Sequence, residues 1–400
     1  MGAKLLYMKR KENNRMVEVI NDINRDRIVK EFIKLTSYDS PSYHEKEIAA
    51  YLKEKLESLG LTVKEDDARE QLLKEDASRT QTANNLYGYL KGNGAPILFS
   101  SHLDTVNPGI GKKAILTDDG RITSDGKTVL GADDISGLVS ILEALTVIKE
   151  KNLPHPDLEI LFTVAEEPYC SGSRFVDYQK LKAKEGYVLD LTGPVGTAAT
   201  AAPSIISLKI GIKGRAAHAG FNPEKGINAL SIAADALTHI RTGRVYEDLT
   251  VNFGTIHGGS GRNIVPEEVW IEGEIRCLEH EKALCEAELI KEIFEKAAKK
   301  YGGKIEFGLT EHIRSYGISK EKNVVQRFLK AAAGVTTLAA PETIITYGGS
   351  DANRLNEHNI DTIVLSCAME NSHGTDEYTT IAELERSAQL ILGLMTGALL

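Results

Sequence analysis

The sequence predicts an α/β fold: a discontinuous domain with a mixed, mostly parallel sheet and helices on both faces, interrupted by an inserted α+β domain. Apolar, strand-like runs alternate with amphipathic helical segments in the first half of the chain and again near its end. The length of 400 residues also exceeds the roughly 250–300 residues at which a single core stops growing. Two domains are therefore expected.

The first half of the chain supplies most elements of the predicted sheet. Apolar residues at helical spacing predict helices, and short apolar runs predict strands. The helices are expected at residues 24–35, 43–59 and 135–149, and the strands at residues 61–63, 85–90, 97–100, 158–165 and 186–189. A charged stretch at residues 65–80 predicts a loop, and turns at 118–120 and 124–126 indicate a short irregular insert.

The pattern changes at residues 202–203, where the inserted domain is expected to begin. Its strands are predicted at residues 205–213, 250–256, 268–277 and 304–309, and its helices at residues 226–242 and 281–300. The chain then continues with a helix at 323–333, strands at 343–346 and 362–367 with a helix between them, and a last helix from about residue 381. We predict one domain from residues 21–202 and 313–400, an inserted domain at 203–312, and an extension at 1–20 in which Met16 is an alternative first residue.

Composition narrows the classes of function. The formal net charge is −9, whereas a nucleic-acid-binding protein needs a basic surface. No apolar stretch reaches the roughly 20 residues of a membrane span, and the start of the chain does not resemble a signal peptide. The cysteines Cys170, Cys277, Cys285 and Cys367 show no Cys-x-x-Cys spacing, so we expect them to be reduced and not to bind zinc. These observations predict a cytoplasmic protein.

Histidines and carboxylates follow several of the predicted strands. His102 and Asp104 end one apolar run, and because side chains alternate along a strand they point to the same face. The other candidates are Asp133 and Asp134 at the start of a helix, Glu166 and Glu167 after the strand 158–165, Asp190 after the strand 186–189, and His373 near the end of the chain. Sites in such sheets form at the carboxyl ends of the strands, so we expect these side chains to meet.

Each of these residues has an ordinary explanation when it is taken alone. Asp133 and Asp134 could cap a helix, and Glu166 and Glu167 could be an exposed strand end. Asp190 alone would be a turn residue. Together they are harder to explain in this way, because carboxylates brought to one place repel each other unless cations compensate. The sequence therefore predicts a metal site.

At these motifs the chain resembles the zinc-dependent metallopeptidases and deacylases that include peptidase T, carboxypeptidase G, aminoacylases and succinyl-diaminopimelate desuccinylase. The resemblance covers nearly the whole chain after residue 20, in motif order and spacing. Two runs, Gly131-Ala-Asp-Asp134 and Gly193-Pro-Val-Gly196, look closest to the peptidase T-like branch. The other matching motifs are Ser101-His-Leu-Asp-Thr105, Ala165-Glu-Glu167, Leu189-Asp190, Ala217-His-Ala-Gly220 and Ser372-His-Gly-Thr375.

The resemblance implies two zinc ions per subunit, bridged by Asp133, whose peptide bond to Asp134 would be cis. One ion would take His102 and Asp190 as ligands. The other would take Glu167 and His373. Such ions usually lie about 3.5–4 Å apart and share a water whose pKa they lower. Manganese or cobalt could replace zinc, since carboxylate-rich sites with histidines accept them.

The same resemblance implies catalytic roles for three residues. Glu166 would be the general base that takes a proton from the shared water and passes it to the leaving amine. Asp104 would orient the ring of His102. His218 would polarise the scissile carbonyl from the partner subunit of a homodimer. The inserted domain would form that dimer and act as a lid, with domain closure completing the site.

Three more residues are implied to contact the substrate. Arg276 would hold a substrate carboxylate with its bidentate guanidinium. Asn263 would lie near the substrate, and Gly349, in the loop Gly348-Gly-Ser-Asp351, would line the pocket. Taken alone, Arg276 would be a surface strand residue and Asn263 a turn residue.

The leading hypothesis is a dinuclear zinc hydrolase that cleaves the amide bond of small substrates. Within this class, we expect an aminopeptidase that acts on short peptides, as a tripeptidase does. An N-acyl amino acid deacylase or a carboxypeptidase of the same family stays open, and substrate length and side-chain preference stay undetermined.

Two remote alternatives come from other classes. A serine hydrolase would use Ser350, which follows a strand, with Asp361 and His373 after it in the required order, although Ala352 takes the place of the last elbow glycine. A non-catalytic dimeric binding protein should have lost the base or a ligand, whereas Glu166 and the ligand positions are all present.

Overall fold

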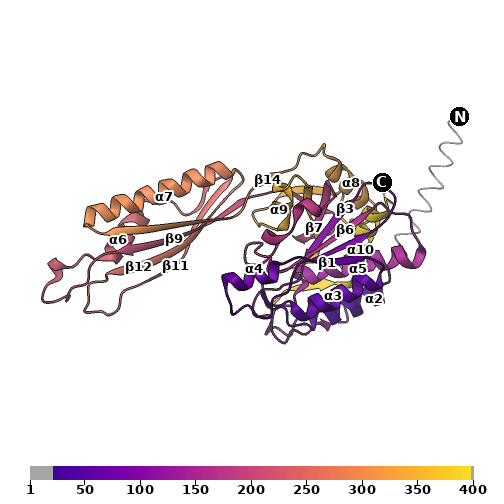
Figure 1. Cartoon of the computed structure of the whole chain (residues 1–400), viewed down its shortest axis with the longest axis horizontal. Helices are drawn as coiled ribbons and strands as arrows, with labels where there is room; N and C mark the ends of the chain where they lie inside the picture. The colour runs from indigo at the N-terminus through magenta and orange to yellow at the C-terminus, as the bar shows by residue number, and fades with distance from the viewer. Residues whose placement is uncertain (1–20, 398–400) are drawn as a thin grey trace. The chain divides into compact units, whose positions relative to one another are not determined.

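The computed structural model describes residues 21–397, and these residues form two compact units (Figure 1). The predicted extension at residues 1–20 lies outside the described residues. The first unit contains the described residues up to Ala201, then Gly317–Thr346, and the described residues from Ser350 onward. The second unit contains Ala202–Tyr316 and Tyr347–Gly349. The chain thus leaves the first unit and returns to it.

A nine-stranded mixed sheet forms the centre of the first unit, which confirms the predicted α/β fold. The strand order is β1-β2-β6-β3-β7-β16-β8-β14, with β15 beside β8. The strands are β1 (Thr62–Glu65), β2 (Leu86–Leu90), β3 (Ile97–His102), β6 (Leu158–Thr163), β7 (Glu185–Thr192), β8 (Thr197–Ala202), β14 (Tyr316–Gly317), β15 (Glu342–Ile345) and β16 (Asp361–Met369). The four central strands β6, β3, β7 and β16 are parallel to their neighbours in that group. Every residue of β3 and β6 is buried, as expected for strands covered on both faces.

Some helices of this unit begin at a capping side chain. The side chain of Asn24 accepts a hydrogen bond from the backbone of Arg27 at the start of α2, and Thr380 does the same for Glu383 at the start of α10. The helix α5 contacts β3, β7 and β16 and packs against α2 and α10. The helices of this unit are α2 (Arg25–Thr36), α3 (Lys46–Ser58), α4 (Ala68–Glu75), α5 (Ala132–Lys151), α8 (Asn323–Ala332), α9 (Asp351–Glu357) and α10 (Ile381–Thr396).

Two of the predicted irregular segments are regular in the structure. Residues 65–80, predicted as a loop, contain the helix α4, whose Ala68 and Leu72 are fully buried one turn apart. The carboxylate of Asp66 accepts the amide of Ala68 at 3.0 Å and so begins this helix. The predicted irregular insert contains the strands β4 (Ile115–Leu116) and β5 (Arg121–Thr123), which pair with each other, and β5 also pairs with β17 (Tyr378–Thr380). That partner strand is far away in sequence, so local patterns did not reveal the pairing.

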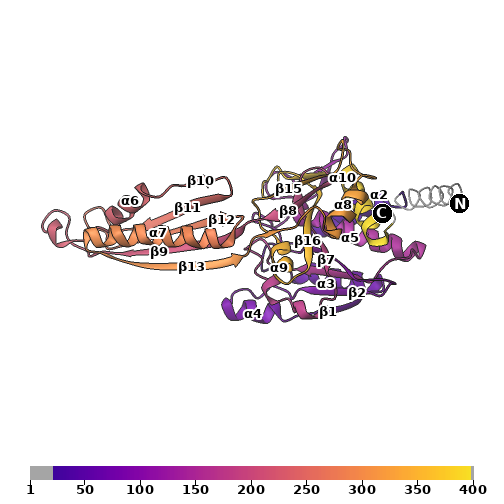
Figure 2. The same ribbon diagram turned by 90° about the horizontal axis from the view of Figure 1, so that it is seen from above.

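The second unit is a five-stranded antiparallel sheet with two helices (Figure 2). The order is β10-β11-β12-β9-β13, formed by β9 (Ser204–Lys213), β10 (Gly243–Tyr246), β11 (Leu249–Gly258), β12 (Glu268–Cys277) and β13 (Lys304–Ile313). The helices α6 (Ala229–Thr238) and α7 (His280–Tyr301) contact each other and the central strands. Side chains such as Ile210, Ile271 and Phe294 form a core separate from that of the first unit. Among residues 21–397, no helix is long and apolar enough to cross a membrane.

The core of the first unit gives a direct test of the fold. Phe32 on α2 is fully buried, whereas its neighbour Ile33 is 38% exposed. We expect Phe32→Ala to lower the free energy of unfolding by about 3–5 kcal/mol, because it leaves a cavity that the core cannot fill. The matched change Ile33→Ala should cost less than about 1 kcal/mol. Urea unfolding followed by circular dichroism measures both, and equal effects would contradict this placement of α2.

Candidate metal centre

Four of the candidate side chains lie at or near the carboxyl ends of the central strands of the larger sheet. His102 is the last residue of β3, and Glu166 and Glu167 follow the end of β6. Asp190 lies within β7, which continues three residues further than predicted. Along the pairing of β7 with β16, Leu189 faces Leu365 and Leu191 faces Ser366, so Asp190 is the extra residue of an irregularity that directs its side chain.

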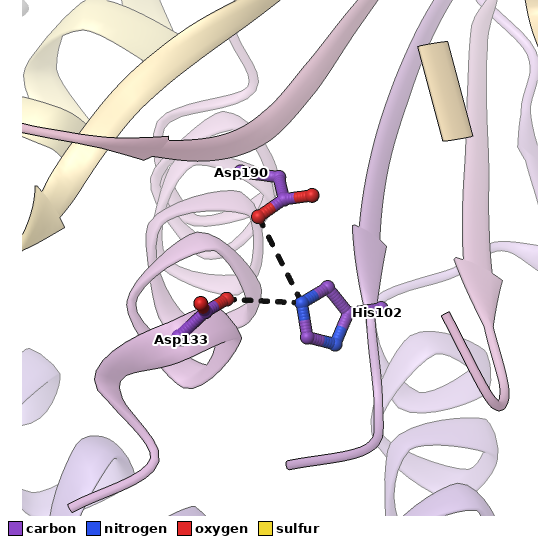
Figure 3. A group of neighbouring side chains, drawn as sticks. All are labelled: His102, Asp133 and Asp190. Atoms are coloured by element: carbon purple, nitrogen blue, oxygen red, sulfur yellow. Dashed lines mark hydrogen bonds and ion pairs between the residues drawn. The ribbon is translucent and has the colours of Figure 1, made fainter. Parts of the chain in front are cut away.

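A first group of side chains surrounds the ring of His102 (Figure 3). Its Nε2 atom lies 3.0 Å from Oδ1 of Asp133 and 3.9 Å from Oδ1 of Asp190. Its Nδ1 atom lies 2.9 Å from the carbonyl oxygen of Asp104 and 3.5 Å from Oδ1 of the same residue. The ring is buried, so these contacts fix its orientation. Its Nε2 atom faces the carboxylates that could share a metal ion with it.

A second group forms on the other oxygen of Asp133. Nε2 of His373 lies 3.3 Å from Oδ2 of Asp133 and 3.1 Å from Oε2 of Glu167. The two oxygens of Asp133 therefore face two different histidines. The peptide bond between Asp133 and Asp134 is cis, as the resemblance implied.

Charge explains the protonation of this centre. Burial alone would lower the pKa of His102, but the hydrogen bonds with Asp104 and Asp133 raise it well above its ordinary value. Hydrogen bonds to Asp133 and Glu167 raise the pKa of His373 to about 10. Burial raises the pKa of Asp190 well above its ordinary value, and the nearby Glu166 adds to this shift. The cluster of histidines and carboxylates therefore retains protons until a metal cation replaces them.

Backbone hydrogen bonds to two buried carboxylates fix the turn that carries Glu166 and Glu167. Asp104 accepts the amide of Glu166 on Oδ1 at 2.9 Å and the amide of Glu167 on Oδ2 at 3.2 Å. Glu45 accepts the amide of Ala165 at 3.1 Å. Three successive amides thus point at carboxylates. Asp104 acts on both glutamates as well as on the ring of His102.

The prediction missed Glu45 and Glu377, which hold the segments that carry candidate ligands. Glu377 accepts the amide of Gly131 on Oε2 at 2.6 Å and that of Asp133 on Oε1 at 2.9 Å. Burial raises the pKa of Glu377 to about 7. Its position four residues after His373 was a usable signal. Glu45 had none, because it precedes Ala165 by 120 residues and stands at the start of a helix.

The other four predicted site residues belong to the second unit. There, His218 and Asn263 lie close together, since the amide of Ala219 donates to the carbonyl oxygen of Asn263 at 3.0 Å. Nδ1 of the exposed His218 accepts the amides of Gly220 and Phe221, both at 3.1 Å. A ring nitrogen that accepts carries no proton, so the proton of the neutral ring is on Nε2. His218 therefore presents an N–H donor.

Arg276 and Gly349 occupy another part of the second unit. Arg276 donates from Nη1 to the carbonyl oxygen of Tyr347 at 2.9 Å and from Nε to Oε1 of Glu274 at 2.7 Å. Part of its guanidinium is therefore already engaged. A Cβ at Gly349 would lie 2.1 Å from Cδ1 of Ile313, so packing within this unit explains the glycine.

The residues of the serine-hydrolase alternative do not form a triad. Ser350 caps α9, where its side chain accepts the amide of Ala352 at 3.3 Å. Asp361 pairs with Lys322, and His373 lies against Asp133 and Glu167. These contacts account for all three residues of the supposed triad.

Comparisons with known proteins show which proteins this chain resembles. The model of a peptidase dimerisation domain matches residues 200–302, and the model of peptidase family M28 matches residues 85–202. A tripeptidase structure from Staphylococcus aureus is 36% identical, with a TM-score of 0.88 over 94% of this chain and 99% of its own. The structure of aminopeptidase PepT from Bacillus cereus is 37% identical, with a TM-score of 0.84 over the same shares. The uncharacterized protein YqjE of Bacillus subtilis is 37% identical over 94% of this chain and 99% of its own length.

The fold, the cluster of histidines and carboxylates and these matches define a metallopeptidase, a hydrolase that cleaves peptide bonds. More closely, the chain belongs to the peptidase T-like metallopeptidases of the M20 family.

The donor set fits divalent metal ions. His102, Asp133 and Asp190 form one group of potential ligand atoms, and Asp133, Glu167 and His373 form another. Within the described residues, Oε1 of Glu167 is buried without a hydrogen-bond partner, which is costly unless a cation binds it. Imidazoles and carboxylates in such numbers suit zinc, manganese or cobalt.

Because both histidines have raised pKa values, metal binding at neutral pH should release protons. A ligand imidazole must be neutral, so we expect roughly one proton to leave each histidine and the apparent affinity to fall as pH falls. Calorimetric titration of the metal-free protein with zinc at pH 7, in buffers of different ionisation enthalpy, measures the release. His373→Gln should lower it by about one proton, whereas changing the exposed His239 to Gln should not. Heats that do not depend on the buffer would contradict the expectation.

Proposed function

We propose that this chain is a dinuclear zinc aminopeptidase that removes the N-terminal residue from short peptides. The observation that carries the proposal is the position of Asp133, whose two oxygens face His102 and His373 separately. A carboxylate placed in this way suits a bridge between two ions. His102 and Asp190 would hold one ion, and Glu167 and His373 the other.

When bound, the metal ions would polarise the scissile carbonyl and lower the pKa of a water molecule. Glu166 would take the proton of the attacking water and pass it to the leaving amine. Burial raises the pKa of Glu166 well above its ordinary value, and Asp351 and Glu167 add to the shift, so its carboxyl group suits a role in which it must hold a proton. Asp104 would orient Glu166 through the backbone and His102 through its ring.

The second unit would supply the dimer interface and part of the substrate site. Its match to a peptidase dimerisation domain supports this role for the inserted domain, predicted at residues 203–312. The Nε2–H group of His218 would donate to the carbonyl oxygen of a substrate bound to the partner subunit. The N–H groups of Arg276 not engaged by Glu274 or Tyr347 would bind the substrate carboxylate, while Asn263 and Gly349 would line the pocket. A cytoplasmic location also stays a prediction.

A panel of substrates separates the candidate activities. We expect the zinc-loaded protein to remove N-terminal residues from di- and tripeptides and to leave N-acetylated peptides and N-acyl amino acids intact. Full chelation should abolish turnover, and added zinc, manganese or cobalt should restore it. Mass spectrometry of the products identifies the cleaved bond. Cleavage of only the N-acyl amino acids would indicate a deacylase, loss of C-terminal residues a carboxypeptidase, and turnover after full chelation would exclude the metal mechanism.

Removing the base tests the mechanism itself. We expect Glu166→Gln to lower kcat roughly 100- to 10,000-fold, because the amide cannot accept the proton of water. The variant should still bind two equivalents of metal. Glu150→Gln, which changes an exposed glutamate on α5, is the matched control and should keep full activity. Unchanged turnover in the Glu166 variant would remove it from the proposed role.

A further inference from the structure

Cys170 lies in the turn that follows Glu166 and contacts the side chain of that residue. Its Sγ atom donates a hydrogen bond to Oε1 of Glu166 at 3.2 Å. The cysteine is 1% exposed, so water does not compete for this contact. The proposed mechanism assigns no part to this thiol.

We propose that Cys170 is a positioning residue that holds the carboxylate of Glu166 by a hydrogen bond from its thiol to Oε1, so that Oε2 exchanges protons with water and the leaving amine. This inference rests on the proposed function of Glu166 as the base. Asp104 fixes the backbone of Glu166 through its amide, and Cys170 fixes the far end of the same side chain. The two contacts together define where the carboxylate lies.

The backbone of the turn supports the inference independently. Tyr169 and Cys170 have φ angles of 62° and 54°, in the left-handed region that favours glycine. The turn holds this conformation through the amide of Cys170, which donates to the carbonyl oxygen of Glu166 at 2.5 Å. The hydroxyl of Ser173 donates to the carbonyl oxygen of Cys170 at 3.2 Å. A cysteine in place of glycine in this strained conformation indicates that its side chain has a role.

The surroundings of Cys170 favour a protonated thiol, which is the form that can donate. Burial raises the pKa of Cys170 well above its ordinary value, and the neighbouring carboxylates of Glu166 and Asp351 add to the shift. Asp351 is buried, and its Oδ1 atom has no hydrogen-bond partner within the described residues. Ligand atoms of Glu166, Cys170 and Asp351 all lie within 4.8 Å of one another. A third metal ion held by these three residues is therefore the rival explanation.

Three substitutions separate the hydrogen bond from packing. Cys170→Ala removes both donor and volume, Cys170→Val removes the donor but fills the space, and Cys170→Ser keeps a donor. In the zinc-loaded protein we expect kcat for a tripeptide to fall about tenfold in the alanine and valine variants, with KM within about twofold of wild type. The serine variant should keep kcat within about threefold. Changing Cys277, a buried cysteine of the second unit, to alanine is the matched control and should leave both constants unchanged.

The outcomes distinguish this inference from the proposed function. If wild type cleaves peptides and Glu166→Gln does not, but all three Cys170 variants keep full kcat, the positioning role is wrong and the base stands. If wild type cleaves no peptide, the proposed function is wrong. A serine variant as slow as the alanine variant would also contradict the hydrogen bond.

Cobalt tests the rival explanation without measuring turnover. Titration of the metal-free protein with cobalt should saturate at two equivalents with no thiolate-to-cobalt charge-transfer band, and the Cys170→Ala protein should give the same spectrum. A third equivalent with such a band, lost in Cys170→Ala, would make Cys170 a metal ligand and overturn the inference.

Discussion

Hydrogen bonds from backbone amides to buried carboxylates hold the turns on which the metal centre depends. Glu45 accepts the amide of Ala165, and Asp104 accepts the amides of Glu166 and Glu167. Glu377 accepts the amides of Gly131 and Asp133. Charge-assisted bonds of this kind are short and strong where water is excluded. The candidate ligands are therefore positioned by acids that belong to neither of their two groups. This division gives the neighbouring carboxylates a structural role beside the candidate ligands.

The same clustering of carboxylates causes electrostatic repulsion in the metal-free protein. Acids gathered in a buried site repel one another, so the cluster holds protons on its histidines and on several carboxyl groups. A divalent cation that replaces those protons relieves the repulsion. Metal occupancy and the stability of this part of the fold are thus coupled, because an ion that binds only the folded site stabilises it by mass action.

The sequence predicted those parts of the structure that local patterns specify. The strand at 268–277 was placed correctly, because the apolar residues Val269, Ile271, Ile275 and Cys277 fall on one face of a strand and are buried. The helix α4 was missed because charged residues conceal its two buried positions, and β4 and β5 were missed because their third strand comes from residues 378–380. For the candidate metal centre, the motifs predicted that the side chains of the first unit, from His102 to His373, would lie close together. Glu45 was not predictable, because its contact with Ala165 exists only in the folded chain.

The position of β16 has a consequence for the synthesis of the protein. This strand lies between β7 and β8, yet the chain reaches it only at Asp361, after the whole segment from Ala202 to Tyr316. Before β16 is synthesised, the backbone N–H and C=O groups along the facing edges of β7 and β8 lack this partner strand. The nearly continuous second unit can fold during that interval. Until β16 is synthesised, this open edge presents unpaired backbone groups with which another chain can pair.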